Sequence, residues 1–599
     1  MRKAIISTLS VLVILVSGCT TSVQPPPLIA GRSVFTRDIG KVDFGGISFK
    51  PWDVDTAVTA AGISEPKAYT IMIYLNGSDL ETDGAEATKD ILEMLSSGLD
   101  TDMVNVIIFT GGTYRWRNDA VPADECVLWR LERDGLGKIT GVGLRDMGDA
   151  GTLASFIDFS LHCFPAEKFG LIFWDHGGGS IAGYGHDELF GDSSLTLLEM
   201  EYAFRRSGLF DQKLEFIGFD ACLMATVEMA VIAAPYARYM IASQDLEPGD
   251  GWDYVFLGAL NENPALSGAE LGRAVVDSYM AFYGPGSTER LTMSVTDLSR
   301  VQYVMGAMGG LMSRAGELLA NDRESYFPAI SRRRHRTKTF GLGTPRDNDS
   351  DMVDIADMSR RLRGLFPAEA AALLTALDDA VVYNRHNSLT DLGGLASYYI
   401  FGGKRDAKHT LGVYSGLHMS EHYTNFLLKF AGVINDSHAV QNAPLEACRT
   451  LWRETADGAV MVGRRDAGNA ADGLWPVIGG HYVCMYKVCE TANCTEYAVP
   501  VHHNGHDADL VVRFAGGRFD IVGTRREEGY MIQKGLNPLS DGDEISFYCK
   551  MADQADWALS GSVTVNGGLR LEWKEADGQY FTRLMHTDIC LNEYFAETH

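Results

Sequence analysis

Two short stretches of this chain, WDHGGG at 174–179 and GFDACLM at 218–224, decide its fold. Each one closes a run of apolar residues that has the length and composition of a buried β-strand. Neighbouring parallel strands end at the same edge of an open α/β sheet, which is where such sheets carry out their chemistry. We therefore expect His176 and Cys222 to lie side by side at that edge. A thiol next to an imidazole can act as a nucleophile with its base.

Short apolar runs alternate with segments of helical spacing from residue 68 onward. Further strands are expected at 69–75, 105–109 and 239–242, and helices at 85–95, 153–163, 197–206 and 224–234. This alternation predicts an α/β fold with a mainly parallel sheet covered by helices on both faces. Residues 268–434 add a helix-rich extension, and the β-type runs beyond 445 predict a separate C-terminal, sandwich-like all-β domain.

Length and charge limit the classes of function. A chain of 599 residues is too long for one hydrophobic core, so two or three folded units are expected. The apolar fraction of 46% is ordinary for a globular protein and argues against a largely disordered chain. The net charge of −27 argues against nucleic acid as a partner, because phosphate-backbone binding depends on clustered Lys and Arg.

The N-terminus has the features of an export signal. Arg2 and Lys3 precede an apolar stretch at 4–16 that is too short for a comfortable transmembrane span, and VSGC follows at 16–19. This ending resembles a bacterial lipobox, which implies cleavage before Cys19 and lipidation of that residue. The alternative is an ordinary secretory signal with a chance cysteine. The expected location is the bacterial cell envelope, at the outer membrane or cell surface, with the lipid as membrane anchor.

Four segments follow from these observations. They are a signal peptide at 1–18, a lipidated N-terminus and linker at 19–67, an α/β catalytic domain at 68–435 and a β-rich domain at 445–599. The linker contains PPP at 25–27, and we expect it to have little structure of its own.

The two stretches quoted first resemble the clostripain family of cysteine peptidases, which share the caspase and gingipain fold. The resemblance continues through YLNGSDLE at 74–81 and EPGDGWDY at 247–254, and more weakly through 351–357 and 394–399, so it covers roughly residues 68–430. It implies a cysteine endopeptidase with a caspase-like sheet that acts on peptide or protein substrates. The C-terminal domain lies outside the resemblance.

The resemblance assigns catalysis to the residues that the strand pattern already brings together. Cys222 is the nucleophile and His176 is its acid–base partner. The backbone N–H groups of Gly177 and Cys222 are the expected oxyanion donors, because glycines after the histidine allow a substrate carbonyl to approach closely. A helix predicted just after Cys222 is expected to favour the thiolate through its dipole. No third catalytic residue is assigned.

The resemblance also implies a substrate preference. Family members cleave after Arg, sometimes after Lys, through an acidic pocket, and a carboxylate is well matched to a guanidinium. Asp220 matches a family position near that pocket, and Asp245, which follows a predicted strand, is the candidate for its floor. Ser243 is a further candidate substrate-binding residue. For Asp245 the alternative is a solvated loop acid or a cap.

Family members often cut themselves after Arg or Lys between the histidine and the cysteine. Here HDELFGD at 186–192 has no basic residue, and the later Arg205, Arg206 and Lys213 fall in or beside predicted regular structure. Self-processing at the usual place is therefore not expected. The basic run RRRHR at 332–336 is interpreted as an exposed loop, with cleavage there as the alternative.

The thiol chemistry requires no cofactor. Some clostripain relatives need calcium, and Asp79 and Asp83 stand in a sequence that loosely resembles an EF-hand loop, so they are candidate calcium ligands. Cys489 and Cys494 have four residues between them, which is a poor match to zinc-ligand spacing. We interpret them as a disulfide or as free buried thiols.

Two other functions fit parts of the sequence. HGGG at 176–179 also occurs as an oxyanion motif of esterases, but those need a downstream G-x-S-x-G sequence, and this chain has none. The alternative outside enzymology is a catalytically inactive, peptidase-like surface lipoprotein that binds peptides or proteins. The presence of both His176 and Cys222 argues against it. We therefore expect an active, monomeric enzyme.

Overall fold

The computed structural model describes residues 37, 39–341, 350–401, 407–435, 474–483, 485–528, 531–550 and 557–575. All of them belong to one compact unit, which begins at Phe35. The predicted signal peptide and the predicted lipidation site at Cys19 lie outside the described residues.

Within the described part of the chain, a nine-stranded sheet has the order β14-β11-β10-β9-β5-β1-β2-β3-β4. Its strands are β1 (Lys67–Asn76), β2 (Val104–Gly111), β3 (Val127–Glu132), β4 (Gly135–Gly141), β5 (Ala166–Trp174), β9 (Leu214–Asp220), β10 (Ala237–Ala242), β11 (Thr292–Asp297) and β14 (Val381–His386). The central strands β10, β9, β5, β1 and β2 pair in parallel, and antiparallel strands flank them on both sides. The predicted mainly parallel sheet is confirmed.

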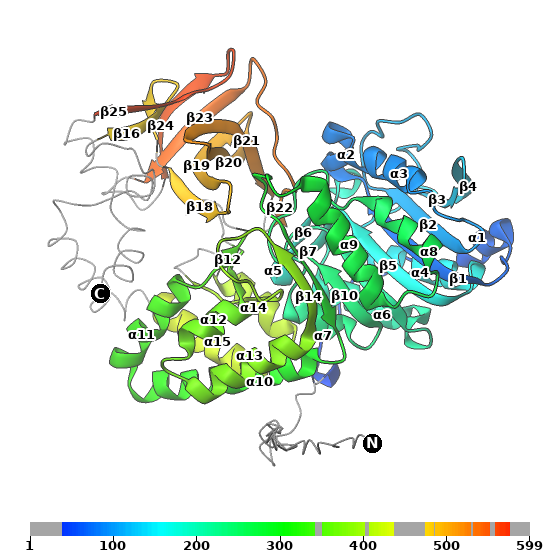
Figure 1. Cartoon of the computed structure of the whole chain (residues 1–599), viewed down its shortest axis with the longest axis horizontal. Helices are drawn as coiled ribbons and strands as arrows, with labels where there is room; N and C mark the ends of the chain where they lie inside the picture. The colour runs from blue at the N-terminus through cyan, green and yellow to red at the C-terminus, as the bar shows by residue number, and fades with distance from the viewer. Residues whose placement is uncertain are drawn as a thin grey trace, which may run out of the picture. The chain divides into compact units, whose positions relative to one another are not determined.

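Alternate residues of the central strands pack against two different helical layers. On β1, Met72 and Tyr74 join one hydrophobic cluster, whereas Ile71 and Ile73 join another. A parallel sheet that is covered on both faces requires this continuous apolar sequence. The helices of the first layer are α4 (Ala150–Cys163), α6 (Leu197–Arg206) and α7 (Val227–Ala233), and those of the second are α3 (Glu86–Ser96) and α9 (Gly268–Tyr283). Figure 1 shows these helices around the sheet.

A helix-rich extension continues the first layer, as the sequence predicted. Its helices are α10 (Val301–Asn321), α11 (Arg323–His335), α12 (Ile355–Leu362), α13 (Pro367–Ala380), α14 (Ala407–Gly416) and α15 (Glu421–Asn435), drawn in green to yellow-green in Figure 1. Met305, Leu373 and Phe426 of this extension share one hydrophobic cluster with the first layer. The short strands β12 (Thr339–Phe340), β13 (Met352–Asp354) and β15 (Ala396–Tyr398) form a small sheet beside it.

The C-terminal part is all-β within the described residues, as predicted. Its strands are β16 (Leu474–Ile478), β17 (His481–Tyr482), β18 (Tyr486–Glu490), β19 (Thr495–His503), β20 (His506–Ala515), β21 (Arg518–Glu528), β22 (Met531–Ile532), β23 (Glu544–Lys550), β24 (Trp557–Thr564) and β25 (Leu571–Glu575). They enclose a hydrophobic cluster of their own, around Tyr497, Leu510 and Phe547. Figure 1 shows them in yellow to red.

The main C-terminal sheet continues into the loop that follows His176. Its order runs β24-β23-β19-β20-β21-β22-β6-β7-β8, and the last three strands belong to the α/β domain. They are β6 (Gly177–Gly178), β7 (Gly183–Asp187) and β8 (Ser193–Leu195). The C-terminal β-domain is therefore hydrogen-bonded to the loop next to the predicted catalytic histidine.

The described part of the predicted linker is folded against the α/β domain. It includes the helix α1 (Val54–Ala61) and the buried Trp52, whose ring lies 6.2 Å from that of Phe109 and 5.9 Å from that of Phe159. Asp149 accepts a hydrogen bond of 2.7 Å from the backbone N–H of Lys50. The expectation of little structure was wrong here, because the apolar Trp52 provides core contacts that the Pro-rich start of the segment does not suggest.

Candidate functional site

His176 lies two residues beyond the end of β5, at the carboxyl edge of the sheet. Its Nε2 lies 2.7 Å from Oδ1 of Asp79, and its Nδ1 accepts a hydrogen bond of 2.8 Å from the backbone N–H of Lys534. Burial alone would lower the pKa of His176, but attraction to Asp79, and then to Asp175, outweighs burial and raises it. An N–H can donate only to an unprotonated nitrogen, so the contact with Lys534 fixes Nδ1 as the acceptor and leaves the proton on Nε2.

Cys222 lies two residues beyond the end of β9, the strand next to β5. The residue after it, Leu223, has a φ of 63°, a left-handed conformation that is unfavourable for a side chain with a Cβ. The N–H of Leu223 bonds the carbonyl of Asp245 at 3.2 Å and holds this turn. The predicted helix at 224 begins only at Val227, so its dipole does not start at the cysteine, and that expectation was wrong.

The thiol of Cys222 is buried and hydrogen-bonded to the loop that follows β10. Its Sγ accepts a hydrogen bond of 3.2 Å from the backbone N–H of Glu247, and the side chain is fully buried. Burial, and then the charge of Glu247, raises the pKa of the thiol to about 12. Gly177 packs directly on this loop, because a Cβ built on it would lie 2.0 Å from the carbonyl oxygen of Cys222. The structure therefore brings His176, Gly177 and Cys222 together.

A buried acidic pocket adjoins the cysteine, and the side chain of Lys534 fills it. The Lys534 ammonium forms an ion pair with Oδ1 of Asp220 and lies 3.6 Å from Oε2 of Glu247. All three side chains have an exposed fraction of 0%. Burial would lower the pKa of Lys534, but the two carboxylates outweigh it and raise the pKa, so the ammonium stays charged.

Aromatic side chains and one glycine form the walls of this pocket. The Lys534 ammonium lies 5.6 Å from the centre of the Trp174 ring, and the hydroxyl of Tyr254 donates to Oδ2 of Asp220 at 3.1 Å. Gly251 makes the space, since a Cβ built there would lie 2.5 Å from Asp220 and 2.6 Å from the ammonium. Its φ of +62° also favours glycine.

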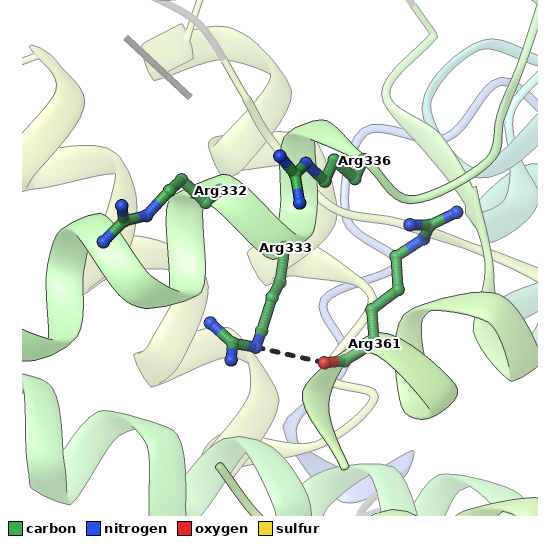
Figure 2. A pocket seen from close by; sticks show the side chains of 4 residues that line it. All are labelled: Arg332, Arg333, Arg336 and Arg361. Atoms are coloured by element: carbon green, nitrogen blue, oxygen red, sulfur yellow. Dashed lines mark hydrogen bonds between the residues drawn. The ribbon is translucent and has the colours of Figure 1, made fainter. Parts of the chain in front are cut away.

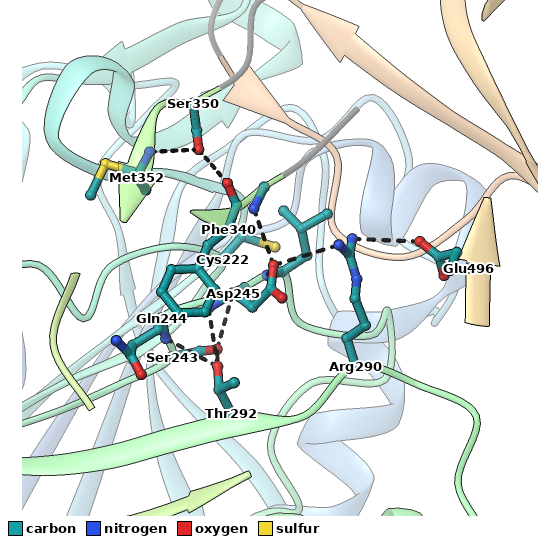
Figure 3. A network of polar contacts seen from close by, with 12 residues as sticks. Cys222, Ser243, Gln244, Asp245, Arg290, Thr292, Phe340, Ser350, Met352 and Glu496 are labelled. Atoms are coloured by element: carbon teal, nitrogen blue, oxygen red, sulfur yellow. Dashed lines mark hydrogen bonds and ion pairs between the residues drawn. The ribbon is translucent and has the colours of Figure 1, made fainter. Parts of the chain in front are cut away.

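Asp245 and Ser243 do not contact the Lys534 ammonium. Their side chains form hydrogen bonds that stabilise the loop beside Cys222. Oδ1 of Asp245 accepts hydrogen bonds from the N–H groups of Leu246 and Gly341 and lies 3.7 Å from Arg290. The hydroxyl of Ser243 donates to the carbonyl of Asp245 at 2.9 Å. Figure 3 shows this network, with Arg290 between Asp245 and Glu496 of the C-terminal domain.

A buried ionic network joins the C-terminal domain to the α/β domain. Glu496 lies 3.7 Å from Arg290, 3.2 Å from Arg513 and 3.1 Å from Arg525. Arg513 also makes a two-pronged contact with Glu289, at 2.5 and 2.7 Å. Burial would raise the pKa of Glu496, but Arg525, then Arg290 and Arg513 lower it to about 2.

This lowered pKa predicts an acid-sensitive contribution to stability. A carboxylate with a depressed pKa in the folded state stabilises it above the unfolded pKa, and the contribution is lost as the pH falls toward the folded pKa. Glu496→Gln is therefore expected to destabilise the protein by roughly 3 kcal/mol at pH 7, and the difference should shrink between about pH 4.5 and pH 2. Thermal unfolding of both proteins across this range checks it, with the exposed Glu572→Gln as control. A difference independent of pH would contradict the assignment.

Asp79 and Asp83 line a small cavity next to His176. The cavity has a volume of about 190 Å³, and its lining also includes Glu188, Asp192, Arg526 and Gln533. The carboxylate of Asp79 is bonded to His176 and to Gln533, at 2.7 and 2.6 Å. Among the described residues, no group of three or more His, Cys, Asp or Glu side chains is arranged to hold a metal ion. The possibility of calcium at Asp79 and Asp83 stays a prediction.

The basic run at 332–336 is not an exposed loop. Its first four residues form the end of α11, and Arg334 is buried, with hydrogen bonds to the carbonyl of Tyr399 and to Asp351. Arg332, Arg333 and Arg336 line a cavity of about 480 Å³ together with Arg361, as Figure 2 shows. Regular helical structure at this run disfavours the alternative of proteolytic cleavage there. Cys489 and Cys494 are free, buried thiols.

Sequence reasoning missed three residues of this site. Asp79 was interpreted only as a calcium ligand, although it lies in the quoted sequence at 74–81. Glu247 opens the quoted sequence at 247–254, and its acidic residue next to a glycine-rich turn could have indicated a pocket wall. Lys534 gave no signal, since it is one lysine among ordinary β-type sequence far from both catalytic strands.

Part of this chain is similar in sequence to known proteins. A profile of the clostripain family, peptidase family C11, matches residues 73–399. Clostripain of Hathewaya histolytica is 25% identical over 231 residues, which are 34% of this chain and 44% of that protein. The chain thus matches less than half the length of this curated relative.

Two of the solved structures that match this chain are each 18% identical to it in sequence. A secreted C11 cysteine protease from Bacteroides thetaiotaomicron, in complex with an irreversible peptide inhibitor, aligns with a TM-score of 0.44 over 59% of this chain and 99% of its own. An inactive zymogen C11 protease from Parabacteroides distasonis aligns with a TM-score of 0.45 over 61% of this chain and 99% of its own.

In the described part of this chain, no helix is both long and apolar enough to cross a membrane.

Proposed function

The chain belongs to the clostripain family, and from this premise we propose that it is a cysteine endopeptidase that cleaves peptide bonds after Lys or Arg. One observation carries the substrate preference: the buried Asp220–Glu247 pocket beside Cys222 already holds a lysine ammonium. In this proposal Glu247 replaces Asp245, the residue expected from the sequence at the floor of the pocket, whose carboxylate lies 3.7 Å from Arg290.

The pocket also fits a guanidinium. Lys534 bonds Asp220, whereas the carboxylate oxygens of Glu247 have no hydrogen-bond partner among the described residues. A guanidinium presents several N–H donors in a planar fork and can reach two carboxylates at once. An arginine side chain could therefore bond both acids where the lysine bonds one. This supports Arg as well as Lys before the cleaved bond.

The chemistry follows from the positions of the two catalytic side chains. Sγ of Cys222 attacks the carbonyl carbon of the cleaved bond, and Nδ1 of His176 receives the thiol proton and delivers it to the leaving amide nitrogen. The C–N bond breaks and leaves a thioester, which water hydrolyses to a carboxylate and the restored thiol. Asp79, at 2.7 Å from Nε2, orients the ring and stabilises its protonated form.

The developing oxyanion needs donors at the same edge of the sheet. We assign the backbone N–H groups of Gly177 and Cys222 to this role, because the two residues are packed against each other so closely that no Cβ fits on Gly177. A single donor of this kind contributes about 3–4 kcal/mol to the stabilisation of the transition state in other enzymes. The same two residues thus position the nucleophile and the anion that it creates.

A panel of fluorogenic peptides ending in Arg, Lys or a neutral residue tests this function. Whatever its absolute rate, the full-length protein should hydrolyse the Arg and Lys peptides at least about 100-fold faster than the neutral ones, because a neutral side chain in the pocket leaves the buried acids unpaired. Measurements with and without calcium address the predicted ion requirement. Hydrolysis that shows no preference for a basic residue would contradict the proposal.

The place of action is also part of the proposal. A secreted protease is among the proteins of similar fold, and the sequence at 16–19 resembles a lipobox. We propose that the enzyme is exported and anchored to the cell envelope through a lipid on Cys19, where it would meet peptide and protein substrates.

A further inference from the structure

The lysine in the acidic pocket belongs to the chain itself and comes from the C-terminal β-domain. Lys534 follows β22 and lies 358 residues after His176 in the sequence. Because its ammonium is fully buried between Asp220 and Glu247, no substrate side chain can enter the pocket while it is there. Removing one partner of a buried ion pair is strongly unfavourable. The ion pair of Lys534 with Asp220 therefore holds this segment in the pocket.

The same segment forms hydrogen bonds with two groups that His176 needs for catalysis. They are its own Nδ1 atom and the carboxylate of Asp79. The backbone N–H of Lys534 donates to Nδ1 of His176 at 2.8 Å, which is the atom that would accept the thiol proton. Nε2 of Gln533 donates to Asp79 at 2.6 Å, on the opposite side of the ring. With its Nδ1 lone pair engaged, His176 cannot act as a base toward Cys222.

Backbone pairing continues on both sides of the lysine. Before it, Ile532 of β22 pairs with Gly177 of β6, the residue assigned to the oxyanion site. After it, the N–H of Gly535 donates to the carbonyl of Glu247 at 3.3 Å. The segment from Met531 to Gly535 therefore crosses the site, and its first two residues add the short strand β22 beside Gly177, a binding mode that proteins also use for extended peptides.

The segment is positioned as an inhibitor and not as a substrate. In a productive complex, the residue in the acidic pocket directs its carbonyl at Cys222, and the amide nitrogen that follows it faces His176. Here the nitrogen that faces His176 is that of Lys534 itself, and the next one, of Gly535, bonds Glu247 instead. The backbone is displaced by one amide, so the bond after Lys534 is not presented to the catalytic pair.

We propose that the C-terminal β-domain is a built-in inhibitor, whose Lys534 occupies the pocket for a basic side chain and keeps the peptidase latent until this segment is displaced. The inference rests on the proposed function. The interface outside the site supports it: Glu496 of the β-domain lies 3.7 Å from Arg290, and Arg513 of the β-domain forms an ion pair with Glu289. This network holds the β-domain in place over the site that contains His176 and Cys222.

Lys534→Glu in the full-length protein tests the inference, because it places a third carboxylate in the pocket and should expel the segment. The rate at which a lysine-ended, thiol-reactive peptide probe alkylates Cys222, followed by intact mass, should rise at least about tenfold over wild type, as should the hydrolysis of lysine-ended peptides. Lys574→Glu reverses the charge of a half-exposed lysine of the same domain and should leave both rates unchanged. Equal rates in wild type and Lys534→Glu would overturn the inference.

A second variant acts outside the active site. Glu289→Ala removes the two-pronged contact with Arg513 and leaves the pocket and the catalytic pair intact, so it should also raise the rate of alkylation if the domain must stay docked to inhibit. It decides the matter if Lys534→Glu does not fold: no increase in Glu289→Ala would then overturn the inference. Cleavage of the wild-type chain after Lys534, seen by mass spectrometry, would also overturn it, since the segment would be a substrate.

Failure of the inference differs from failure of the proposed function. If the peptidase function is wrong, neither wild type nor Lys534→Glu reacts with any peptide or probe in a way that depends on Cys222. If only the inhibitor is wrong, wild type reacts as fast as the variant.

Discussion

Cys222→Ala is expected to lower kcat/KM on lysine- and arginine-ended peptides by about 10⁴-fold or more, to the level of the uncatalysed background. The loss follows from the proposed role of Sγ, which forms the covalent bond to the substrate. His176→Ala should cause a loss of similar size, because the two side chains act as a unit and the thiol, with its pKa raised to about 12 by burial, depends on a base. Peptide hydrolysis is best measured in the Lys534→Glu background. The parent protein is expected to be most active there, so the largest loss of rate can be detected.

The control for this pair is another buried cysteine. Cys163→Ala removes a free, buried thiol at the end of α4 and should leave kcat/KM within a few-fold of the parent protein. Hydrolysis that survives in Cys222→Ala, or that disappears equally in Cys163→Ala, would contradict the assignment of the nucleophile.

Asp220→Asn is expected to lower kcat/KM on lysine- and arginine-ended peptides by about 10²- to 10³-fold, and to change the rate on neutral-ended peptides far less. Asp220 is fully buried, and it also accepts hydrogen bonds from the backbone N–H of Trp252 at 3.3 Å and from Tyr254 at 3.1 Å. An amide keeps the size of the side chain but removes the charge that balances the substrate cation. The ratio of the two rates therefore measures the electrostatic part of specificity.

Asp220 also binds Lys534, so this experiment is done in the Lys534→Glu background, in which the segment no longer fills the pocket. Asp250→Asn serves as the matched control, because Asp250 lies in the same 247–254 sequence but is half-exposed and pairs with Lys89 at 3.4 Å. An equal fall in the rates on basic and neutral peptides would show that Asp220 maintains the fold of the site and does not select the substrate.

The sequence was sufficient to predict the scaffold and the neighbouring ends of the two strands that precede His176 and Cys222. The apolar runs before His176 and Cys222 are buried strands that pair in parallel, with Trp174 opposite Asp220 at their ends. This could be predicted because a strand covered on both faces must be continuously apolar, and because parallel strands share one carboxyl edge. The C-terminal β-domain was predictable from its Gly- and Asn-separated runs.

The pocket and its occupant could not be read from the sequence in the same way. Glu247 reaches the pocket because the loop after β10 turns over Cys222, which depends on hydrogen bonds such as that from Leu223 to Asp245. Asp245 was the natural choice from spacing, but its carboxylate is engaged by Arg290. Lys534 lies in the pocket because the C-terminal β-domain packs against the α/β domain. A contact between two domains cannot be predicted from the local sequence around Lys534.

Two local predictions were wrong for physical reasons. The helix expected at 224 begins at Val227, because Leu223 adopts a left-handed turn and the chain first pairs with the loop after β10. The basic run at 332–336 looked solvated because of its charge, yet the guanidinium of Arg334 is buried, where it bonds Asp351 and the carbonyl of Tyr399. A charged side chain can be buried when the interior provides hydrogen-bond partners for it, so charge alone does not predict exposure.

The central claim is that Cys222 attacks substrates whose basic side chain enters the Asp220–Glu247 pocket. The most direct measurement is to treat the full-length Lys534→Glu protein with two irreversible, thiol-directed peptide inhibitors that differ only in a terminal lysine or norleucine, and to map the modified residue by mass spectrometry. The account predicts a single adduct, on Cys222, that forms at least about 100-fold faster with the lysine compound. An adduct on another cysteine, or equal rates with the two compounds, would contradict it.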